Sequence, residues 1–205
     1  GVHNGSGFYQ QFHQSGNDGF YGNHGFHGTY SGKGENLEAE ISLTFDEAAF
    51  GCDKMITLQE ADGNRTLKVH IPAGIDTGQS VRLRGKGHPG IGGGEPGDLL
   101  LRAKVGTKPG YERKGADVYT TVNIPYTTAA LGGEARVSTL YGDVSCKIKE
   151  GTQSGSKIRL RGKGIVSMKN PNVHGDQYVT VQIQVPRHLN QQARRKLMEY
   201  KQACG

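Results

Sequence analysis

The sequence has 205 residues, enough for one or two domains of ordinary size, but only 34% are hydrophobic, none is Trp and 33 are Gly. The formal net charge of +6 permits an acidic partner without identifying one. Cys52, Cys146 and Cys204 form no Cys-x-x-Cys pair, and no apolar stretch reaches about 18 residues, which argues against a disulfide framework, a closed zinc site and a membrane-spanning helix. We therefore expect a cytoplasmic protein that needs no metal or cofactor.

Residues 1–36 differ in composition from the rest of the chain. They hold ten Gly and four of the six Phe residues, together with Tyr9, Tyr21 and Tyr30, and almost no Val, Leu or Ile. A segment without aliphatic side chains cannot build a core, so we expect a flexible Gly- and aromatic-rich linker. Its histidines match no compact metal-site spacing, and we assign them no metal.

The remainder contains an internal repeat. Val-Arg-Leu-Arg-Gly-Lys-Gly at 81–87 returns as Ile-Arg-Leu-Arg-Gly-Lys-Gly at 158–164, and each copy is followed by a Gly-Asp pair that opens an alternating strand. Residues 41–51 and 122–132 match as well. The repeat is longer than the roughly 20–50 residues of solenoid units, so it indicates one small domain duplicated. We predict domain I at 37–110 and domain II at 111–186.

In domain I, alternating apolar residues predict a half-buried strand from Leu37 to Phe45. Asp46 as N-cap and Gly51 as C-terminal residue predict one or two helical turns between them. Asp62-Gly63 is typical of a hairpin turn. Further strands are expected at 54–58, 67–71, 81–83 and 99–105, with a Gly- and Pro-rich loop at 88–97.

A short joint at 107–115 leads into domain II, which follows the same order. We expect a helix at 128–131 and strands at 118–124, 135–140, 144–148, 158–160 and 178–185, ended by Pro186. The predicted fold class is therefore mostly β: two tandem, similar, small β-sandwich domains, each with one short helix, plus a C-terminal helix.

Residues 187–205 change to a helical period. Leu189, Ala193, Leu197 and Tyr200 fall on one face, and Asn190 is a suitable N-cap. Such an apolar stripe packs either on domain II or on a second copy of the chain. Its place at the end of the sequence favours the second copy, so we predict a dimerisation helix.

No catalytic arrangement emerges. The acidic residues are scattered, and the Gly-Lys-Gly triplets at 85–87 and 162–164 lack the spacing and the following helix of a phosphate-binding loop. Glycine there is better explained by a tight turn that needs positive φ. We therefore interpret the shared motifs as determinants of the fold and expect no enzyme.

Several motifs together resemble a known family: residues 71–87, Gly97-Asp98-Leu99, 129–133 and 158–164. They are similar to the C-terminal peptide-binding region of DnaJ-type (J-domain) co-chaperones, whose glycine/phenylalanine-rich linker the first 36 residues resemble. The J domain with its His-Pro-Asp tripeptide is missing, and His88-Pro89-Gly90 is no substitute. Only a short turn, 59–66, stands where other members insert a cysteine-rich zinc module, so the chain resembles the zinc-free, CbpA-like class.

The resemblance implies a chaperone that binds unfolded or extended hydrophobic segments and works with a DnaK-type partner. It places the peptide groove at Ala39, Ile41, Ile56 and Leu58, with Lys54 nearby for the partner's acidic tail, although these apolar side chains could equally be core. It also implies a homodimer through the terminal helix and no membrane. Two alternatives stay open: a basic nucleic-acid-binding module, as in CbpA-like DNA binding, which the missing basic run and RNA-binding motifs disfavour, and a purely structural β-rod.

Overall fold

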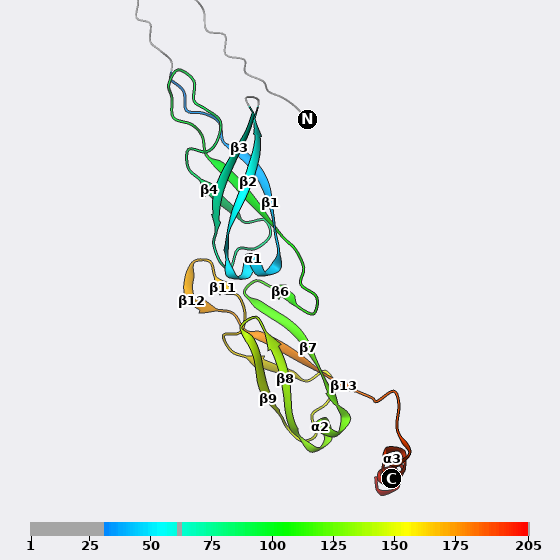
Figure 1. Cartoon of the computed structure of the whole chain (residues 1–205). Helices are drawn as coiled ribbons and strands as arrows, with labels where there is room; N and C mark the ends of the chain where they lie inside the picture. The colour runs from blue at the N-terminus through cyan, green and yellow to red at the C-terminus, as the bar shows by residue number, and fades with distance from the viewer. Residues whose placement is uncertain (1–30, 61–62, 205) are drawn as a thin grey trace, which may run out of the picture.

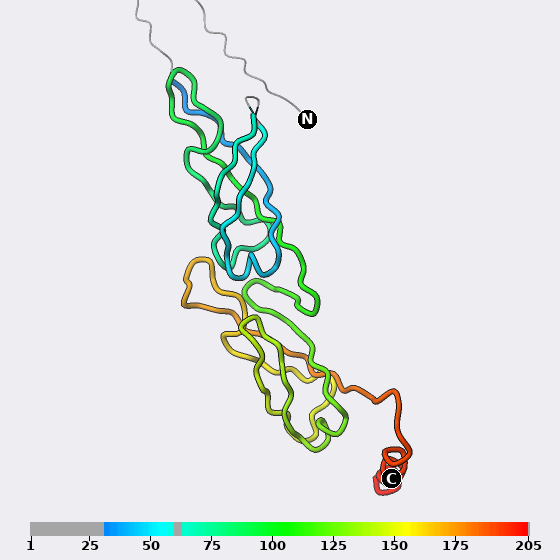
Figure 2. Tube along the Cα trace, in the orientation of Figure 1, coloured from blue at the N-terminus to red at the C-terminus, as the bar shows by residue number. Residues whose placement is uncertain are grey.

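The computed structural model describes residues 31–60 and 63–204, so most of the predicted linker and the tip of the first hairpin lie outside it. Figures 1 and 2 show an elongated molecule in which domain I, domain II and the terminal helix follow one another. In the described ranges strands dominate and three helices occur, one in each repeat and α3 (Gln191–Ala203) near the C-terminus. The mostly β fold class is confirmed.

Domain I consists of a three-stranded sheet and a hairpin. The sheet has the order β1-β5-β4, with β1 (Leu37–Leu43) parallel to β5 (Leu99–Val105) and β4 (Ser80–Leu83) antiparallel to β5. The hairpin joins β2 (Cys52–Glu60) to β3 (Gly63–Ile71). Ile41, Leu99 and Val69 belong to one buried cluster, so the sheet and the hairpin pack face to face.

Helix α1 (Phe45–Phe50) connects β1 to β2, and it begins earlier than predicted. Thr44, not Asp46, is the N-cap: its hydroxyl accepts from the Glu47 amide, and the Glu47 carboxylate accepts from the Thr44 amide. This capping box satisfies donors that a helix end otherwise leaves free. The helix ends before Gly51, as predicted.

Domain II repeats this plan with additions. Its four-stranded sheet, β10-β13-β7-β6, faces the β8–β9 hairpin, and β7 runs parallel to β13. Strand β6 lies in the segment predicted as a joint, and β11 and β12 were not predicted. Pairing between named strands stays within each repeat, while the boundaries at 110/111 and 186/187 remain predictions. The elements are β6 (Glu112–Lys114), β7 (Asp117–Pro125), α2 (Tyr126–Leu131), β8 (Gly133–Thr139), β9 (Gly142–Ile148), β10 (Lys157–Leu160), β11 (Val166–Ser167), β12 (Asn170–His174) and β13 (Gln177–Gln184).

Within each domain, the two repeated motifs are joined by hydrogen bonds and an ion pair. Gly85 adopts φ 66° after β4, and its amide donates to Asp98 Oδ1 at 2.8 Å, while Arg82 pairs with the other oxygen of that carboxylate. Asp176, Gly162 and Arg159 repeat these contacts in domain II. The aspartate of each Gly-Asp pair therefore caps the turn after the neighbouring strand, which explains why both motifs recur together.

The contacts of the Asp98 carboxylate predict that the fold loses stability in acid. The pKa of Asp98 is lowered, first by the Gly85 amide and then by Arg82. Because its pKa in the folded chain lies below the unfolded value of about 4, the carboxylate stabilises the fold above that pH, and the stabilisation disappears as the pH falls through the folded pKa. Urea unfolding at a series of pH values should show a shallower acid decline for Asp98→Asn than for the unchanged chain; an identical decline would contradict this role.

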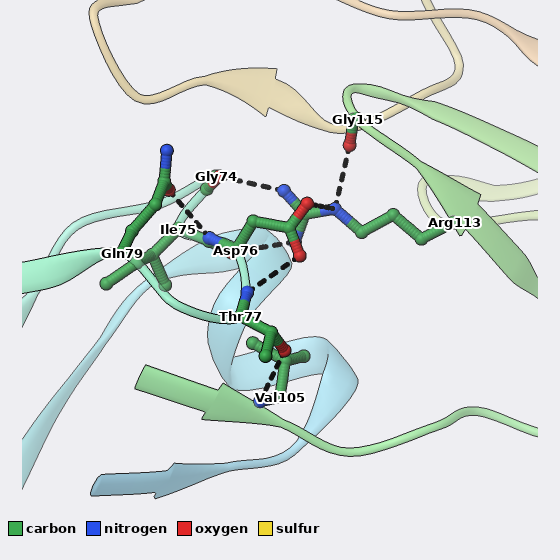
Figure 3. A network of polar contacts seen from close by, with 8 residues as sticks. All are labelled: Gly74, Ile75, Asp76, Thr77, Gln79, Val105, Arg113 and Gly115. Carbon is green, nitrogen blue, oxygen red and sulfur yellow. Dashed lines mark hydrogen bonds and ion pairs between the residues drawn. The ribbon is translucent and has the colours of Figure 1, made fainter. Parts of the chain in front are cut away.

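Arg113 of β6 joins the two domains. Its guanidinium donates to the carbonyls of Ile75 at 2.7 Å and Gly74 at 2.9 Å, and to that of Gly115 at 2.8 Å, while Asp76 lies 3.5 Å from its Nε (Figure 3). Only 10% of the side chain is exposed, and this burial lowers the pKa of Arg113.

An apolar cluster reinforces the junction. Phe45 and Ala49 of α1 pack with Val118 and Ile165 of domain II, all of them buried. Lys108 in the joint also pairs with Asp46 at 2.7 Å. Both apolar and polar contacts therefore hold the two domains together.

Replacing Arg113 tests this junction. Arg113→Met keeps the apolar stem but leaves the carbonyls of Gly74 and Ile75 without their donor, and we expect a loss of about 2–4 kcal/mol of unfolding free energy. Urea unfolding measures it. The exposed neighbour Lys114 provides the control: Lys114→Met should cost no more than about 0.5 kcal/mol. Equal costs for the two variants would rule out a special role for Arg113.

Candidate functional site

Two strands of domain I, β1 and β2, each have an edge without a strand partner and are joined by a side-chain contact. In the described ranges β1 bonds only with β5, and β2 bonds only with β3, so each has one edge free of a strand partner. Lys54 of β2 reaches across and donates to the carbonyl of Ser42 in β1 at 2.8 Å. Figure 1 shows that β1 and the β2–β3 hairpin both run along domain I.

The predicted groove residues all belong to the same apolar cluster but differ in accessibility. Ile41 and Leu58 are buried, with 4% and 8% of their surface exposed, so they contribute to the core. Ala39 and Ile56 are half-buried and pack against that core. The apolar surface that these four residues offer to solvent therefore comes from Ala39 and Ile56. We define Ala39, Ile56 and Lys54 as the edge site.

Lys54 is already engaged within its own domain. Besides the Ser42 carbonyl, its ammonium contacts both carboxylate oxygens of Glu47, at 3.0 and 3.3 Å. The pKa of Glu47 is lowered, first by the Thr44 amide of the capping box and then by Lys54. Sequence reasoning missed Glu47; the capping-box spacing Thr-x-x-Glu was the signal that could have found it. A negatively charged ligand at Lys54 would have to compete with this carboxylate.

Three of the four predicted dimerisation residues lie on α3, and Leu189 lies just before its N-cap. No residue of α3 is fully buried; Leu189 and Ala193 are half-buried, and Leu197 and Tyr200 are each 46% exposed. The Tyr200 hydroxyl lies 2.6 Å from that of Tyr126 in α2. Asn190 caps the helix by accepting from the Ala193 amide, as predicted.

A trough runs between α3 and the end of domain II. It is lined mainly by apolar side chains from α2, from the end of β13 and from α3, and several of them are widely exposed, Leu131 and Val185 at 77% each. Met198, on α3, is 56% exposed. Exposed apolar side chains at this end of the molecule therefore come from α2, from the segment after β13 and from α3.

The match to known proteins covers both domains. The family model of the DnaJ C terminal domain matches residues 37–186. The chain belongs to this family. The resemblance drawn from the sequence motifs is thus confirmed for the DnaJ C-terminal region, while a J domain is not part of the match.

Relatives agree with this assignment. The chain is 45% identical over 139 residues to a chaperone protein DnaJ of Lachnospira eligens, covering 68% of this chain and 37% of the relative. It is 47% identical over 141 residues to a chaperone protein DnaJ of Burkholderia thailandensis, with 69% and 37% covered, and 43% identical over 157 residues to one of Clostridium botulinum, with 75% and 42% covered. The chain spans about two fifths of the length of the DnaJ relatives it matches.

Among its described residues, this DnaJ C-terminal region has neither a cluster suited to a metal ion nor a helix suited to span a membrane. Within residues 31–60 and 63–204, no three His, Cys, Asp or Glu side chains gather in a group suited to a metal ion. No helix in these ranges is long and apolar enough to cross a membrane.

Proposed function

We propose that this chain is the client-binding part of a DnaJ co-chaperone, which holds extended hydrophobic segments of unfolded polypeptides at the edge site. The observation that carries the proposal is that β1 and β2 each keep one edge free of a strand partner, and that Ala39 of β1 and Ile56 of β2 are half-buried on the same apolar cluster. Membership of the DnaJ family supports the same role.

The edge site suits an extended chain for two physical reasons. A peptide laid along a free strand edge gains main-chain hydrogen bonds whatever its side chains are, and an apolar floor then selects hydrophobic residues. Ile56 supplies most of this floor, because Ala39 is small and leaves room beside it. The available apolar area is modest, so a single site binds weakly and releases its client readily.

In this proposal two chains act together. The exposed apolar surface of α3, α2 and the end of β13 docks on a second copy, which places two edge sites in one homodimer. Binding one client at both sites raises the effective concentration for the second contact, and the avidity exceeds the single-site affinity by about 10²-fold or more.

Transfer to a DnaK-type chaperone completes the proposed role. Lys54 is the candidate anchor for an acidic tail of that partner, and binding there would exchange the Glu47 carboxylate for one from the tail. The role is non-catalytic and belongs to the cytoplasm.

A titration with a fluorescently labelled, permanently unfolded polypeptide tests the proposed function. We expect binding that changes little between low and high salt, because apolar contacts and backbone hydrogen bonds dominate. A nucleic-acid-binding module would instead bind a labelled oligonucleotide with an affinity that falls steeply as salt rises. Absence of polypeptide binding together with salt-sensitive oligonucleotide binding would overturn the proposal in favour of that alternative.

A further inference from the structure

Domain II contains the counterpart of the edge site. The match between residues 41–51 and 122–132 places Thr120 of β7 where domain I has Ala39, and Val137 of β8 where domain I has Ile56. As in domain I, β8 bonds only with its hairpin partner, β9, in the described part of the chain. The duplicated fold therefore offers a second place at which a peptide could add.

On its β8 side this second place is covered, however. The inward-facing residues of β8, Ala135, Val137 and Thr139, are exposed by only 7%, 3% and 8%. At the matching positions of β2, Lys54 and Ile56 are half-buried and reach solvent, whereas Leu58 is as buried as Thr139. Strand β8 is thus more completely covered than β2, while Thr120 of β7 is half-buried like Ala39 of β1.

Gln177 of β13 connects β7 and β8. Its side chain is fully buried, and Nε2 donates to Thr120 Oγ1 in β7 at 2.9 Å and to the Ser138 carbonyl in β8 at 3.0 Å. Strand register gives Gln177 the place of Leu99 in domain I, since Gln177 pairs with Val118 as Leu99 pairs with Leu37. A leucine there makes no hydrogen bond to either strand.

Two further differences favour closure. Strand β6 pairs with Asp117, Val118 and Tyr119, which covers part of the β7 edge; β1 has no such partner in the described ranges. The Lys54–Glu47 pair beside the first site is replaced by Ala135 and Thr128, so domain II lacks the charge that accompanies the edge site.

We propose that Gln177 is a specificity-determining brace that closes the second copy of the peptide site and leaves each chain with one. This inference rests on the proposed function of the edge site in domain I. Gln177 Oε1 is buried without a hydrogen-bond partner among the described residues. Leucine in its place therefore removes the brace together with an unsatisfied acceptor, which favours a folded variant.

The test is a titration of the full chain, labelled with ¹⁵N, with a capped synthetic peptide of alternating Leu and Ser. In the unchanged protein we expect backbone amide shifts within 37–43 and 52–59 and none within 133–139, with one peptide bound per chain. In Gln177→Leu we expect shifts in 133–139 as well, and two peptides per chain. Gln182→Leu, on the outer face of the same strand, is the matched control and keeps one.

The outcomes separate the brace from the proposed function. Shifts in both domains of the unchanged protein, at similar peptide concentrations, would overturn the brace and leave the edge site standing. No shifts in the unchanged protein but shifts at 133–139 in Gln177→Leu would support the brace and refute the edge site. No shifts in either protein would refute both.

If Gln177→Leu does not fold, Thr120→Val provides a second variant, because it removes one of the two acceptors. It should also admit peptide at 133–139. A folded variant of either kind that binds only one peptide would refute the brace.

Discussion

Ile56→Asp should weaken the binding of an unfolded polypeptide by more than about tenfold, which corresponds to about 1.4 kcal/mol. The substitution removes most of the apolar floor of the edge site and places a charge where a client's hydrophobic side chain would lie, so the bound state would have to desolvate that carboxylate. Fluorescence anisotropy with a labelled, permanently unfolded polypeptide measures the change in affinity.

Met55→Asp provides a matched control on the same strand. Met55 lies on the opposite face of β2 and is 63% exposed, so the added charge points away from the edge site. Circular dichroism should show both variants folded, because Ile56 is only half-buried and the expected destabilisation is about 1–3 kcal/mol. Client affinity that is unchanged in Ile56→Asp, or equally reduced in Met55→Asp, would count against the edge site.

Removal of residues 187–205 should convert a dimer into monomers. The truncation takes away α3 with Leu197, Met198 and Tyr200, each about half exposed, and leaves the trough beside Leu131 without its partner surface. Sedimentation velocity measures the change, and client avidity should fall by about 10²-fold as the second contact is lost.

A point substitution refines the test of α3. Leu197→Asp puts a charge within the apolar surface and should raise the dimer dissociation constant more than about tenfold. Gln192→Asp changes the same helix at an exposed position outside the trough and should leave the dimer intact. A dimer that survives the truncation would refute the role assigned to α3.

Local patterns predicted most of the fold. Alternating apolar residues located β1, β5 and the strands of both hairpins to within a few residues, because each has one face on a core. The duplicated motifs predicted two similar domains in tandem. The structure supplies the reason that the motifs recur together, because Asp98 contacts both Arg82 and Gly85.

What escaped prediction depends on contacts between distant segments. Strand β6 has no alternation of its own; it forms because the chain folds back along β7 and because Arg113 finds carbonyls in domain I. The helix start was misplaced because Asp46 and Thr44 are both good caps, and the choice depends on Glu47.

The candidate site was only partly predictable for the same reason. Sequence alternation predicts which residues of β1 and β2 face inward, but not how much of each side chain stays exposed to solvent. It therefore could not separate the buried Ile41 and Leu58 from the half-buried Ala39 and Ile56. In domain II the proposed brace is a single side chain, Gln177, whose partners Thr120 and Ser138 are far away in the sequence.

The buried guanidinium at the domain junction bears on which clients a dimer can retain. With domain I held firmly on domain II, the distance between the two edge sites of the proposed dimer would be set by the protein and not by what it carries. A client too short to reach from one region to the other gains nothing from the second, whereas a longer unfolded chain gains the full benefit. Client length would thereby become a selection criterion in its own right, independent of hydrophobicity.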